Sequence, residues 1–376
     1  MPFCVRKCLY CAFYSEPATG ELVDRYVSAL RREMKPAAAG LRPRTVFFGG
    51  GTPSLLSTAQ WTRVLDTMRR LGLLGAAEWT VECNPATLSL DQARLLRSFG
   101  VNRVSLGVQS FDDELLRRLG RIHTRDEVFT SFDLLRRAGF ENLNLDLMFA
   151  IPGQSMAAWR STLADAAALQ PEHLSCYEVI YEEDTPLSAQ LAAGRLDVNE
   201  ELACDQYEEL LARADRHGFA QYEIANFAKR LGRDTAAEVP RLACQHNVNY
   251  WRGGQFHGLG PSATSYVDGI RTKNLPDTVR YCERWEQEQP AIESSEQLSP
   301  LARAGETAAF GLRMTAGWPF EQFRQVTGFD LRAEWQVEMQ ELVARGWGQQ
   351  EVDRFRLTPQ GLRFADAAAE RFLRPG

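Results

Sequence analysis

Apolar residues along the chain gather in short runs that alternate with longer stretches of mixed apolar and charged residues. The short runs are rich in β-branched and aromatic residues and do not alternate strictly with polar ones, which is typical of strands buried on both faces. They predict strands within residues 44–51, 78–84, 101–109, 142–149 and 172–180.

The stretches between these runs have the period of amphipathic helices, with an apolar residue every three or four positions. Examples are residues 24–34, 89–100 and 124–140. Residues that favour helix N-caps and glycines that favour helix C-termini flank several of these stretches. They are Ser57, Ser89 and Thr124 at the starts, and Gly72, Gly100 and Gly139 at the ends.

Strands separated by about 25 to 40 residues, with helices between them, predict repeated βα units and a parallel sheet. We expect an α/β fold with a partial (β/α)6-type barrel in residues 1–228, followed by a connecting segment in residues 229–295. Residues 296–376 should form a smaller α+β domain, in which helices precede a β-turn-β pattern within residues 346–366, as in a winged helix.

Composition narrows the class of protein without identifying it. The 376 residues carry a net charge of −6, which gives no general attraction to nucleic acid. The C-terminal domain is therefore expected to have a structural or docking role rather than to read DNA. The chain has no apolar run of the ~20 residues that a membrane span needs, and no apolar leader precedes its first cysteines. We expect a cytoplasmic protein with reduced thiols.

The first unusual motif is C-x3-C-x2-C, formed by Cys4, Cys8 and Cys11. Thiolates that are this closely spaced in a reducing compartment indicate a metal site more often than a disulfide. A structural zinc ion needs four ligands, and His123 is a candidate for the fourth. A four-iron cluster held by only three thiolates would leave one iron open for chemistry. The spacing leaves a cluster, zinc and incidental cysteines as alternatives.

Polar or glycine residues stand where several predicted strands end. The sequence FFGGGTPS follows the first strand, and Glu82, Gln109 and Asp146 lie at or near the ends of later strands. Ligands of parallel α/β folds bind at the carboxyl ends of the strands. Asp146 lies in an apolar strand, where a carboxylate is costly unless it is paired, and Arg121 is a candidate partner.

Taken together, C-x3-C-x2-C, GGGTPS, ECNP, GVQSF, LGRIHT and NLDLMFAIPGQS resemble the radical S-adenosylmethionine (SAM) superfamily. More narrowly, they resemble oxygen-independent coproporphyrinogen III oxidase and its relatives. The resemblance implies that Cys4, Cys8 and Cys11 hold a [4Fe–4S] cluster and that SAM chelates the fourth iron. It assigns SAM contacts to seven residues: Gly50, Gly51, Thr52, Glu82, Gln109, Arg121 and Asp146.

Two features favour the haem chaperone branch of this family over the oxidases. The oxidases resemble C-x3-C-x2-C-x-C, whereas Phe13 occupies the last cysteine position here. The connecting segment contains an H-N-x-x-Y-W element, which resembles the haem chaperones and implies haem contacts. Its residues are His246, Asn247, Tyr250 and Trp251.

The leading hypothesis is a haem chaperone with a radical SAM core that delivers haem to acceptor proteins, such as respiratory enzymes, membrane-associated ones among them. One alternative is a coproporphyrinogen III oxidase acting in porphyrin biosynthesis by radical oxidative decarboxylation. Another is a structural zinc–thiolate protein. Relatives carry a strand before the cysteine loop, often similar to L-Y-x-H-I-P-F-C. The present sequence starts at MPFC, so we expect that strand to be missing from it or to lie upstream.

Overall fold

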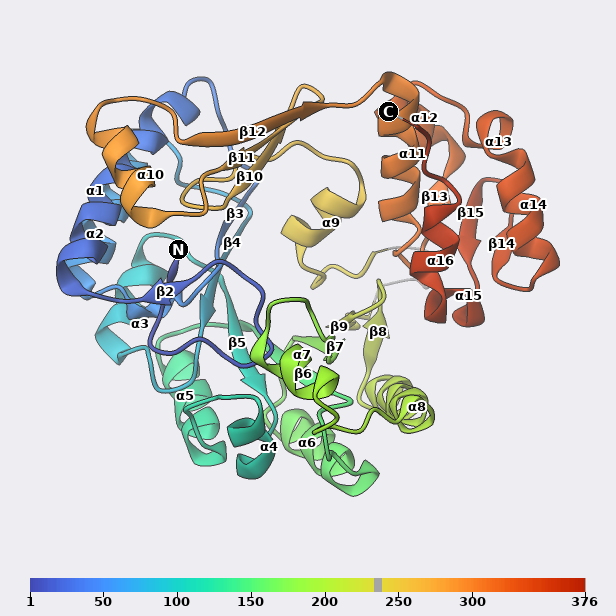
Figure 1. Ribbon diagram of the computed structural model, residues 1–376, viewed down its shortest axis with the longest axis horizontal. Helices are drawn as coiled ribbons and strands as arrows, with labels where there is room; N and C mark the ends of the chain where they lie inside the picture. The colour runs from blue at the N-terminus through green and yellow to red at the C-terminus, as the bar shows by residue number, and fades with distance from the viewer. Residues whose placement is uncertain (233–238, 376) are drawn as a thin grey trace. The chain divides into compact units, whose positions relative to one another are not determined.

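The computed structural model describes residues 1–232 and 239–375, and its chain groups into two compact units (Figure 1). The first unit contains Met1–Phe219, Leu259–Ala263 and Asn274–Glu293. The second contains Ala220–Gly258, Thr264–Lys273 and Ser294–Gly376. Residues 233–238, which belong to the predicted connecting segment, and Gly376 lie outside the described residues. The three sequence-based domain ranges stay a prediction.

The first unit contains five parallel strands, each paired with the next one along the chain. This order is the one that repeated βα units produce, and it confirms the predicted α/β class. The five strands are β3 (Thr45–Phe48), β4 (Glu78–Cys83), β5 (Arg103–Gln109), β6 (Asn142–Phe149) and β7 (His173–Glu178). A separate short pair of parallel strands, β1 (Phe3–Cys4) and β2 (Glu16–Pro17), flanks the cysteine loop.

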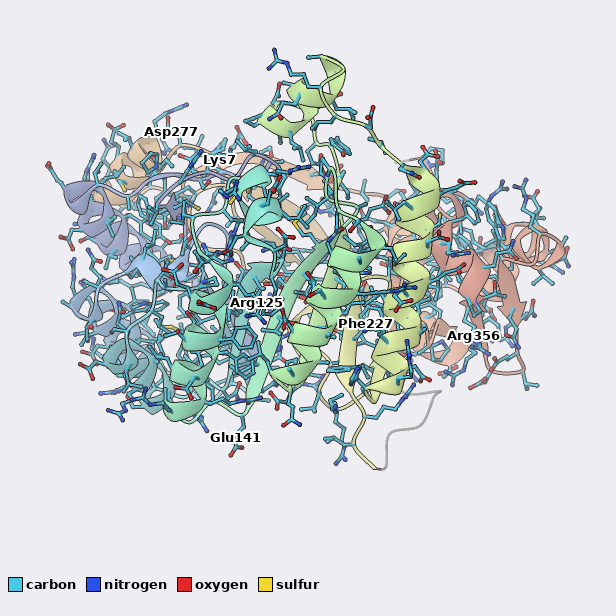
Figure 2. The ribbon with its side chains drawn as sticks, turned by 90° about the horizontal axis from the view of Figure 1, so that it is seen from below. Lys7, Arg125, Glu141, Phe227, Asp277 and Arg356 are labelled. Carbon is cyan, nitrogen blue, oxygen red and sulfur yellow. The ribbon has the colours of Figure 1, made fainter. Side chains whose placement is uncertain are left out.

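Helices alternate with these strands and lie around them (Figures 1 and 2). The predicted caps are confirmed, because Ser57, Ser89 and Thr124 each form a capping box. Within the described residues, none of the helices is long and apolar enough to cross a membrane. The helices of this unit are α1 (Gly20–Ala37), α2 (Thr58–Arg70), α3 (Leu90–Ser98), α4 (Asp113–Arg118), α5 (Arg125–Arg137), α6 (Met156–Ala168), α7 (Pro186–Ala192), α8 (Glu200–Arg216) and α10 (Thr278–Glu286), with the 3-10 turn η1 (Pro53–Leu55).

The second unit ends in the predicted helix-then-hairpin pattern. Helices α11 (Pro300–Gly311), α12 (Phe320–Thr327), α13 (Leu331–Glu334) and α14 (Gln336–Ala344) precede an antiparallel hairpin of β14 (Gly348–Gln350) and β15 (Arg354–Leu357). The other elements are β9 (Asn226–Lys229), α9 (Gln245–Trp251), β10 (Thr264–Val267), β13 (Trp318–Pro319), α15 (Pro359–Arg363) and α16 (Ala365–Glu370). Three strands cross from one unit to the other along the chain: β8 (Phe219–Gln221), β11 (Ile270–Asn274) and β12 (Ile292–Gln297).

Aromatic side chains fill the space between the sheet and the helices of the first unit. Phe48 of β3 packs edge-on against Trp61 of α2, with ring centroids 5.1 Å apart, and stacks on Trp79 of β4 at 6.2 Å. Both tryptophans are fully buried. Because large buried aromatics contribute much of the hydrophobic free energy of folding, this packing makes the strand ends a rigid platform for a site.

One buried polar cluster ties distant segments of the first unit together. The carboxylate of Glu33, on α1, accepts hydrogen bonds from Asn274 Nδ2 (2.7 Å), Tyr281 Oη (2.5 Å) and the Gly260 amide (2.7 Å). All four groups are buried. Buried polar groups need partners, so Glu33 holds two later segments of the chain against the first long helix.

We expect Glu33→Ala to lower the stability of this protein because it removes the acceptor of three buried hydrogen bonds. An unsatisfied buried donor costs roughly 1–3 kcal/mol, so a total loss of about 3 kcal/mol or more is expected. Thermal unfolding followed by circular dichroism measures the change. Glu21→Ala, at an exposed position of the same helix, is the control. Equal melting temperatures for Glu33→Ala and wild type would contradict this role.

Candidate functional site

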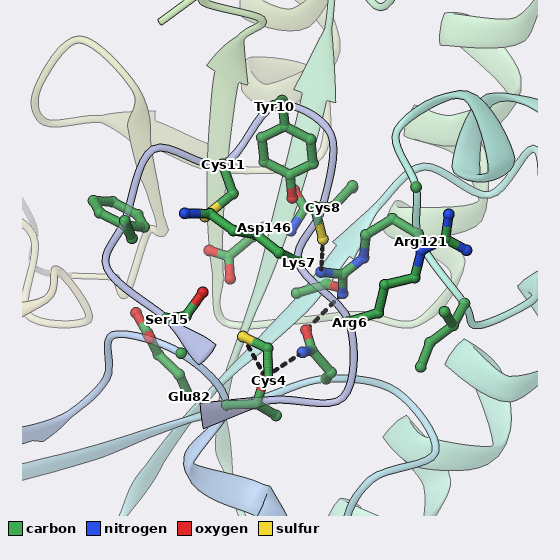
Figure 3. Close-up of a pocket in the computed structure, with 18 of the residues that line it drawn as sticks. Cys4, Arg6, Lys7, Cys8, Tyr10, Cys11, Ser15, Glu82, Arg121 and Asp146 are labelled. Carbon is green, nitrogen blue, oxygen red and sulfur yellow. Dashed lines mark hydrogen bonds between the residues drawn. The ribbon is translucent and has the colours of Figure 1, made fainter. Parts of the chain in front are cut away.

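A cavity of about 460 Å³ opens at the carboxyl ends of the parallel strands in the first unit. All ten residues that the sequence assigned to the metal and to SAM line this one cavity: Cys4, Cys8, Cys11, Gly50, Gly51, Thr52, Glu82, Gln109, Arg121 and Asp146. Figure 3 shows the cysteine loop bordering the cavity, with Arg121 beside Cys8 and with Glu82 and Asp146 contributed by strands β4 and β6. Residues far apart in sequence are therefore brought together, as expected for strand ends that meet at one edge of a sheet.

The three cysteines are free, half-buried thiols on a loop that the rest of the unit holds by its backbone. The Thr52 amide donates to the Phe3 carbonyl (2.7 Å), and the Leu9 amide donates to the Leu119 carbonyl (3.0 Å). Within the loop, the Cys11 amide donates to the Cys8 carbonyl at 3.3 Å. The loop conformation is thus set by backbone contacts on both sides of Cys8.

Two glycines make these backbone contacts possible. A Cβ atom at Gly51 would lie 2.5 Å from the Phe3 carbonyl oxygen, and one at Gly120 would lie 3.0 Å from the Leu9 side chain. Gly120 also has a φ of +76°, which favours glycine. The glycine-rich turn was predicted to lie at a strand end where ligands bind, and the segment that approaches Gly51 in this structure is the cysteine loop itself.

The sulfur atoms also accept side-chain hydrogen bonds. Thr52 Oγ1 donates to Cys4 Sγ, and Arg121 Nη1 donates to Cys8 Sγ, both at 3.5 Å (Figure 3). Arg121 therefore brings a positive charge to the cavity beside a metal-ligand candidate. Because a thiolate-bound cluster is anionic, a guanidinium here would stabilise it.

The donor set fits a cluster better than a single zinc ion. Within residues 1–232 and 239–375, no three His, Cys, Asp or Glu side chains meet around a point that one metal ion would occupy. A four-iron cluster gives each thiolate its own iron, so its ligands surround a larger body and need not meet. His123, the candidate fourth zinc ligand, is buried, and its Nε2 lies 3.0 Å from the Val108 carbonyl oxygen.

Two carboxylates lie on the strand side of the cavity. Burial raises the pKa of the Glu82 carboxyl to about 7, and the neighbouring Asp146 carboxylate adds to the rise. The Gly50 amide, which donates to Glu82 at 3.1 Å, opposes it. Such a carboxyl is costly to ionise until a cation comes close to it. Glu82 and Asp146 thus line the side of the cavity opposite the cysteine loop, and a bound cation would stabilise their ionised forms there.

Asp146 is held in place by a polar network between strands. Asn144 Nδ2 donates to its carboxylate at 2.7 Å, and Ser105 Oγ donates at 3.1 Å. His173, on the next strand, lies with Nδ1 2.6 Å from Asn144 Oδ1. Burial raises the pKa of Asp146 although these donors oppose the rise. The network thus supplies the hydrogen-bond partners that a carboxylate in an apolar strand needs. The donors are Asn144 and Ser105, and not the predicted partner Arg121.

Gln109 and Gly107 shape the end of β5. Gln109 has a φ of +66°, and the pairing of β5 with β6 shifts register between Gly107 and Gln109. A non-glycine residue with positive φ stores strain of about 1–3 kcal/mol and often marks a functional site. This register shift places Gln109 in the lining of the cavity.

One residue of the site was missed by the sequence analysis. Asn84 follows Glu82 in the ECNP motif, and its side chain lies between Thr52 and Arg121, with hydrogen bonds of 2.8 and 2.6 Å. The motif itself marked the position, but nothing in the sequence indicates which partners the amide meets. Phe13, the residue that replaces a cysteine of the oxidases, is 72% exposed at the rim.

The four predicted haem residues lie in the second unit, on or at the end of α9. His246 Nε2 lies 2.8 Å from Tyr250 Oη, and the Tyr250 ring packs edge-on against Phe256 at 4.5 Å. Trp251 packs near Phe310 and under the Arg313 guanidinium. Asn247 is half-buried on the same helix. Helical spacing thus puts His246 and Tyr250 in one aromatic cluster.

Comparison with known proteins matches both ends of the chain to family models. Residues 1–166 match the radical SAM superfamily, and residues 298–364 match the HemN C-terminal domain. In fold, the structure is similar to the coproporphyrinogen III oxidase HemN of Escherichia coli, with a TM-score of 0.83 over 99% of this chain and 88% of that one. The identity is 22%, so this similarity concerns the fold alone.

Curated relatives are more similar in sequence. The protein "Heme chaperone HemW" of Bacillus subtilis is 34% identical, over 96% of this chain and 94% of its own length. HemW of Escherichia coli is 33% identical over 99% and 96%, and HemW of Lactococcus lactis is 32% identical over the same shares. The cavity with its three cysteines and this similarity along almost the whole chain lead to one conclusion: the chain belongs to the HemW family of radical SAM proteins.

Proposed function

We propose that this protein is a haem chaperone with a radical SAM core, which binds haem and delivers it to acceptor proteins. The observation that carries the proposal is the convergence of ten predicted residues on one cavity, in a chain that is similar to HemW proteins over almost its whole length. The acceptors are proteins that use haem, such as respiratory enzymes.

In this proposal Cys4, Cys8 and Cys11 hold a [4Fe–4S] cluster. When reduced, such a cluster would supply the electron for reductive cleavage of bound SAM. The protein's own residues keep the cofactors oriented: Arg121 offers a guanidinium for the SAM carboxylate, which suits its planar geometry. Glu82, with Asp146 beside it, offers a carboxylate to the amino group and the sulfonium. The backbone of Gly50 and Gly51 and the Thr52 and Gln109 side chains complete the wall.

Haem is proposed to bind at α9 in the second unit. His246 supplies an imidazole, which is a common ligand of haem iron, and Tyr250 and Trp251 supply aromatic surface for a porphyrin face. Asn247 adds an amide on the same short helix. Tyr250 Oη lies 2.8 Å from His246 Nε2 and orients the imidazole, and this contact has to open before the same nitrogen can ligate iron.

A second candidate function is oxidative decarboxylation of coproporphyrinogen III, which the sequence match of residues 298–364 to the HemN C-terminal domain favours. To separate the two, the reduced, cluster-loaded protein is incubated with coproporphyrinogen III and SAM, and a HemN enzyme serves as the positive control. A chaperone should form no protoporphyrinogen IX but should transfer bound haem to an apo-haemoprotein. Protoporphyrinogen formation at the rate of the control would replace the proposal with the oxidase.

The cluster assignment predicts that Cys8→Ala abolishes cluster formation. Anaerobic reconstitution of the wild type should give about four irons per chain, because each chain is expected to hold one four-iron cluster. Iron and sulfide analysis measures the loss. Cys204→Ala is the matched control because Cys204 is an exposed thiol on α8, outside the cavity. Full iron content in Cys8→Ala, or its loss in the control, would contradict the assignment.

The raised pKa of Glu82 predicts that SAM binding weakens in acid. The ionised carboxylate attracts the cationic cofactor, and its fraction falls as pH drops through about 7. Affinity should therefore be about tenfold lower at pH 6 than at pH 8, if ionisation of this one group governs binding. Isothermal titration of the loaded protein measures it, with iron content checked at each pH.

Glu82→Gln is the control for that measurement. The amide cannot ionise, so its affinity should be low at pH 8 and should change much less between pH 6 and pH 8. Any dependence that remains belongs to other groups, among them the SAM amino group and the Met1 amine, whose pKa is lowered by burial to about 6. An unaltered pH profile in Glu82→Gln would show that another group causes the dependence.

The haem assignment predicts that His246→Ala weakens haem binding. Loss of an axial ligand should raise the dissociation constant at least about tenfold, or ~1.4 kcal/mol, and should change the absorption spectrum of bound haem. His257→Ala is the matched control, because His257 is an exposed imidazole in the same unit. Unchanged affinity and spectrum in His246→Ala would remove His246 from the site.

A further inference from the structure

A continuous chain of hydrogen bonds connects two of the three cysteines through Asn84. On one side, Asn84 Nδ2 donates to Thr52 Oγ1 (2.8 Å), and Thr52 Oγ1 donates to Cys4 Sγ (3.5 Å). On the other side, Arg121 Nη2 donates to Asn84 Oδ1 (2.6 Å), and Arg121 Nη1 donates to Cys8 Sγ (3.5 Å). One amide thus touches the residues that donate to both sulfurs.

The orientation of this amide is determined by its neighbours. Arg121 is only a donor, so the amide oxygen must face the guanidinium and the nitrogen must face Thr52. Space adds a second constraint, because a Cβ atom at Gly107 would lie 2.9 Å from Asn84 Oδ1 and 3.3 Å from Arg121 Nη2. The Gly107 carbonyl also accepts from Arg121 Nη2. Because Gly107 has no side chain, the Asn84 and Arg121 side chains have room to meet beside it.

The direction of the Thr52 hydroxyl follows from this orientation. A hydroxyl has one hydrogen, and Thr52 Oγ1 already accepts from Asn84. Its hydrogen is left for Cys4 Sγ. If residue 84 presented an acceptor to Thr52 in place of the amide nitrogen, the Thr52 hydroxyl would donate to that acceptor. Cys4 Sγ would then lose its hydrogen bond from Thr52. Asn84 therefore selects which way the hydroxyl points.

We propose that Asn84 is a positioning residue for the cluster, which acts through Thr52 on Cys4 and through Arg121 on Cys8. The inference rests on the proposed function, because it assumes that these cysteines hold a cluster. Hydrogen bonds to the ligating sulfurs are among the factors that determine the reduction potential of an iron–sulfur cluster. By stabilising the more negative, reduced state, both bonds raise that potential, and Asn84 governs both.

The test is a double-mutant cycle on Asn84→Asp and Thr52→Val, read out as cluster reduction potential without SAM and as the electron paramagnetic resonance spectrum. Asparagine and aspartate have the same shape, but aspartate accepts from the Thr52 hydroxyl and withdraws it from Cys4. We expect both single variants to shift the potential to more negative values. In the Asn84→Asp background, Thr52→Val should cause no further shift, because Thr52 no longer donates to Cys4 there.

Two control variants define what each result means. Thr52→Ser keeps the hydroxyl and should keep the wild-type potential, unlike Thr52→Val. Ser15→Ala should also leave the potential unchanged, because Ser15 lines the cavity but its hydroxyl has no partner among the described residues. The comparison of Thr52→Val with Thr52→Ser still tests the Cys4 arm if Asn84→Asp does not load a cluster.

Loaded Asn84→Asp with the wild-type potential and spectrum would overturn the proposal, and so would equal Thr52→Val shifts in the two backgrounds. Either result leaves the proposed function intact, because the variants would still hold a cluster. If the wild type itself takes up no cluster, the proposed function fails, and this inference fails with it.

Discussion

The backbone contact between the cysteine loop and the strand ends is the constraint on which the rest of the site depends. The Thr52 amide donates to the Phe3 carbonyl beside Cys4, and the Leu9 amide donates to the Leu119 carbonyl beside Cys8. The first contact would not form with a side chain at Gly51, where a Cβ atom would lie 2.5 Å from the Phe3 carbonyl oxygen. Beside the second contact, a Cβ atom at Gly120 would lie 3.0 Å from the Leu9 side chain. Glycine at the strand end therefore has a structural role first, and the sulfur positions follow from it.

The two sides of the cavity differ in the charged groups that they carry. The loop side carries thiols with Arg121 beside Cys8, whereas the strand side carries Glu82 and Asp146 in a buried setting that raises the pKa of each. Such a wall is costly to ionise when no cation is near. A cofactor with a carboxylate, an amino group and a sulfonium on one small body complements both walls at once. This charge pattern is what makes the cavity suited to SAM rather than to a neutral ligand.

The two units divide the proposed chemistry between them. The first unit contains every residue assigned to the cluster and to SAM, and the second contains the His246 segment and the helix-then-hairpin region that matches the HemN C-terminal domain. HemN has a similar general fold, and a fold by itself does not determine an activity. The features that favour the proposed haem chaperone are local: Phe13, where the resemblance gives the oxidases a cysteine, and the aromatic cluster around His246.

The sequence by itself determined the alternation of strands and helices, the three caps at Ser57, Ser89 and Thr124, and ten of the residues that line the cavity. It did so because helix and strand periods, cap chemistry and closely spaced thiols are local signals. Only the tertiary structure decided the partners. It gave Asp146 the donors Asn144 and Ser105 instead of Arg121, turned Arg121 toward Cys8, and placed Asn84 between Thr52 and Arg121. Asn144 and Asp146 are two positions apart on one strand, but the other contacts join residues 32 to 113 positions apart. Only the packing of strands and loops in the folded chain determines such distant pairs.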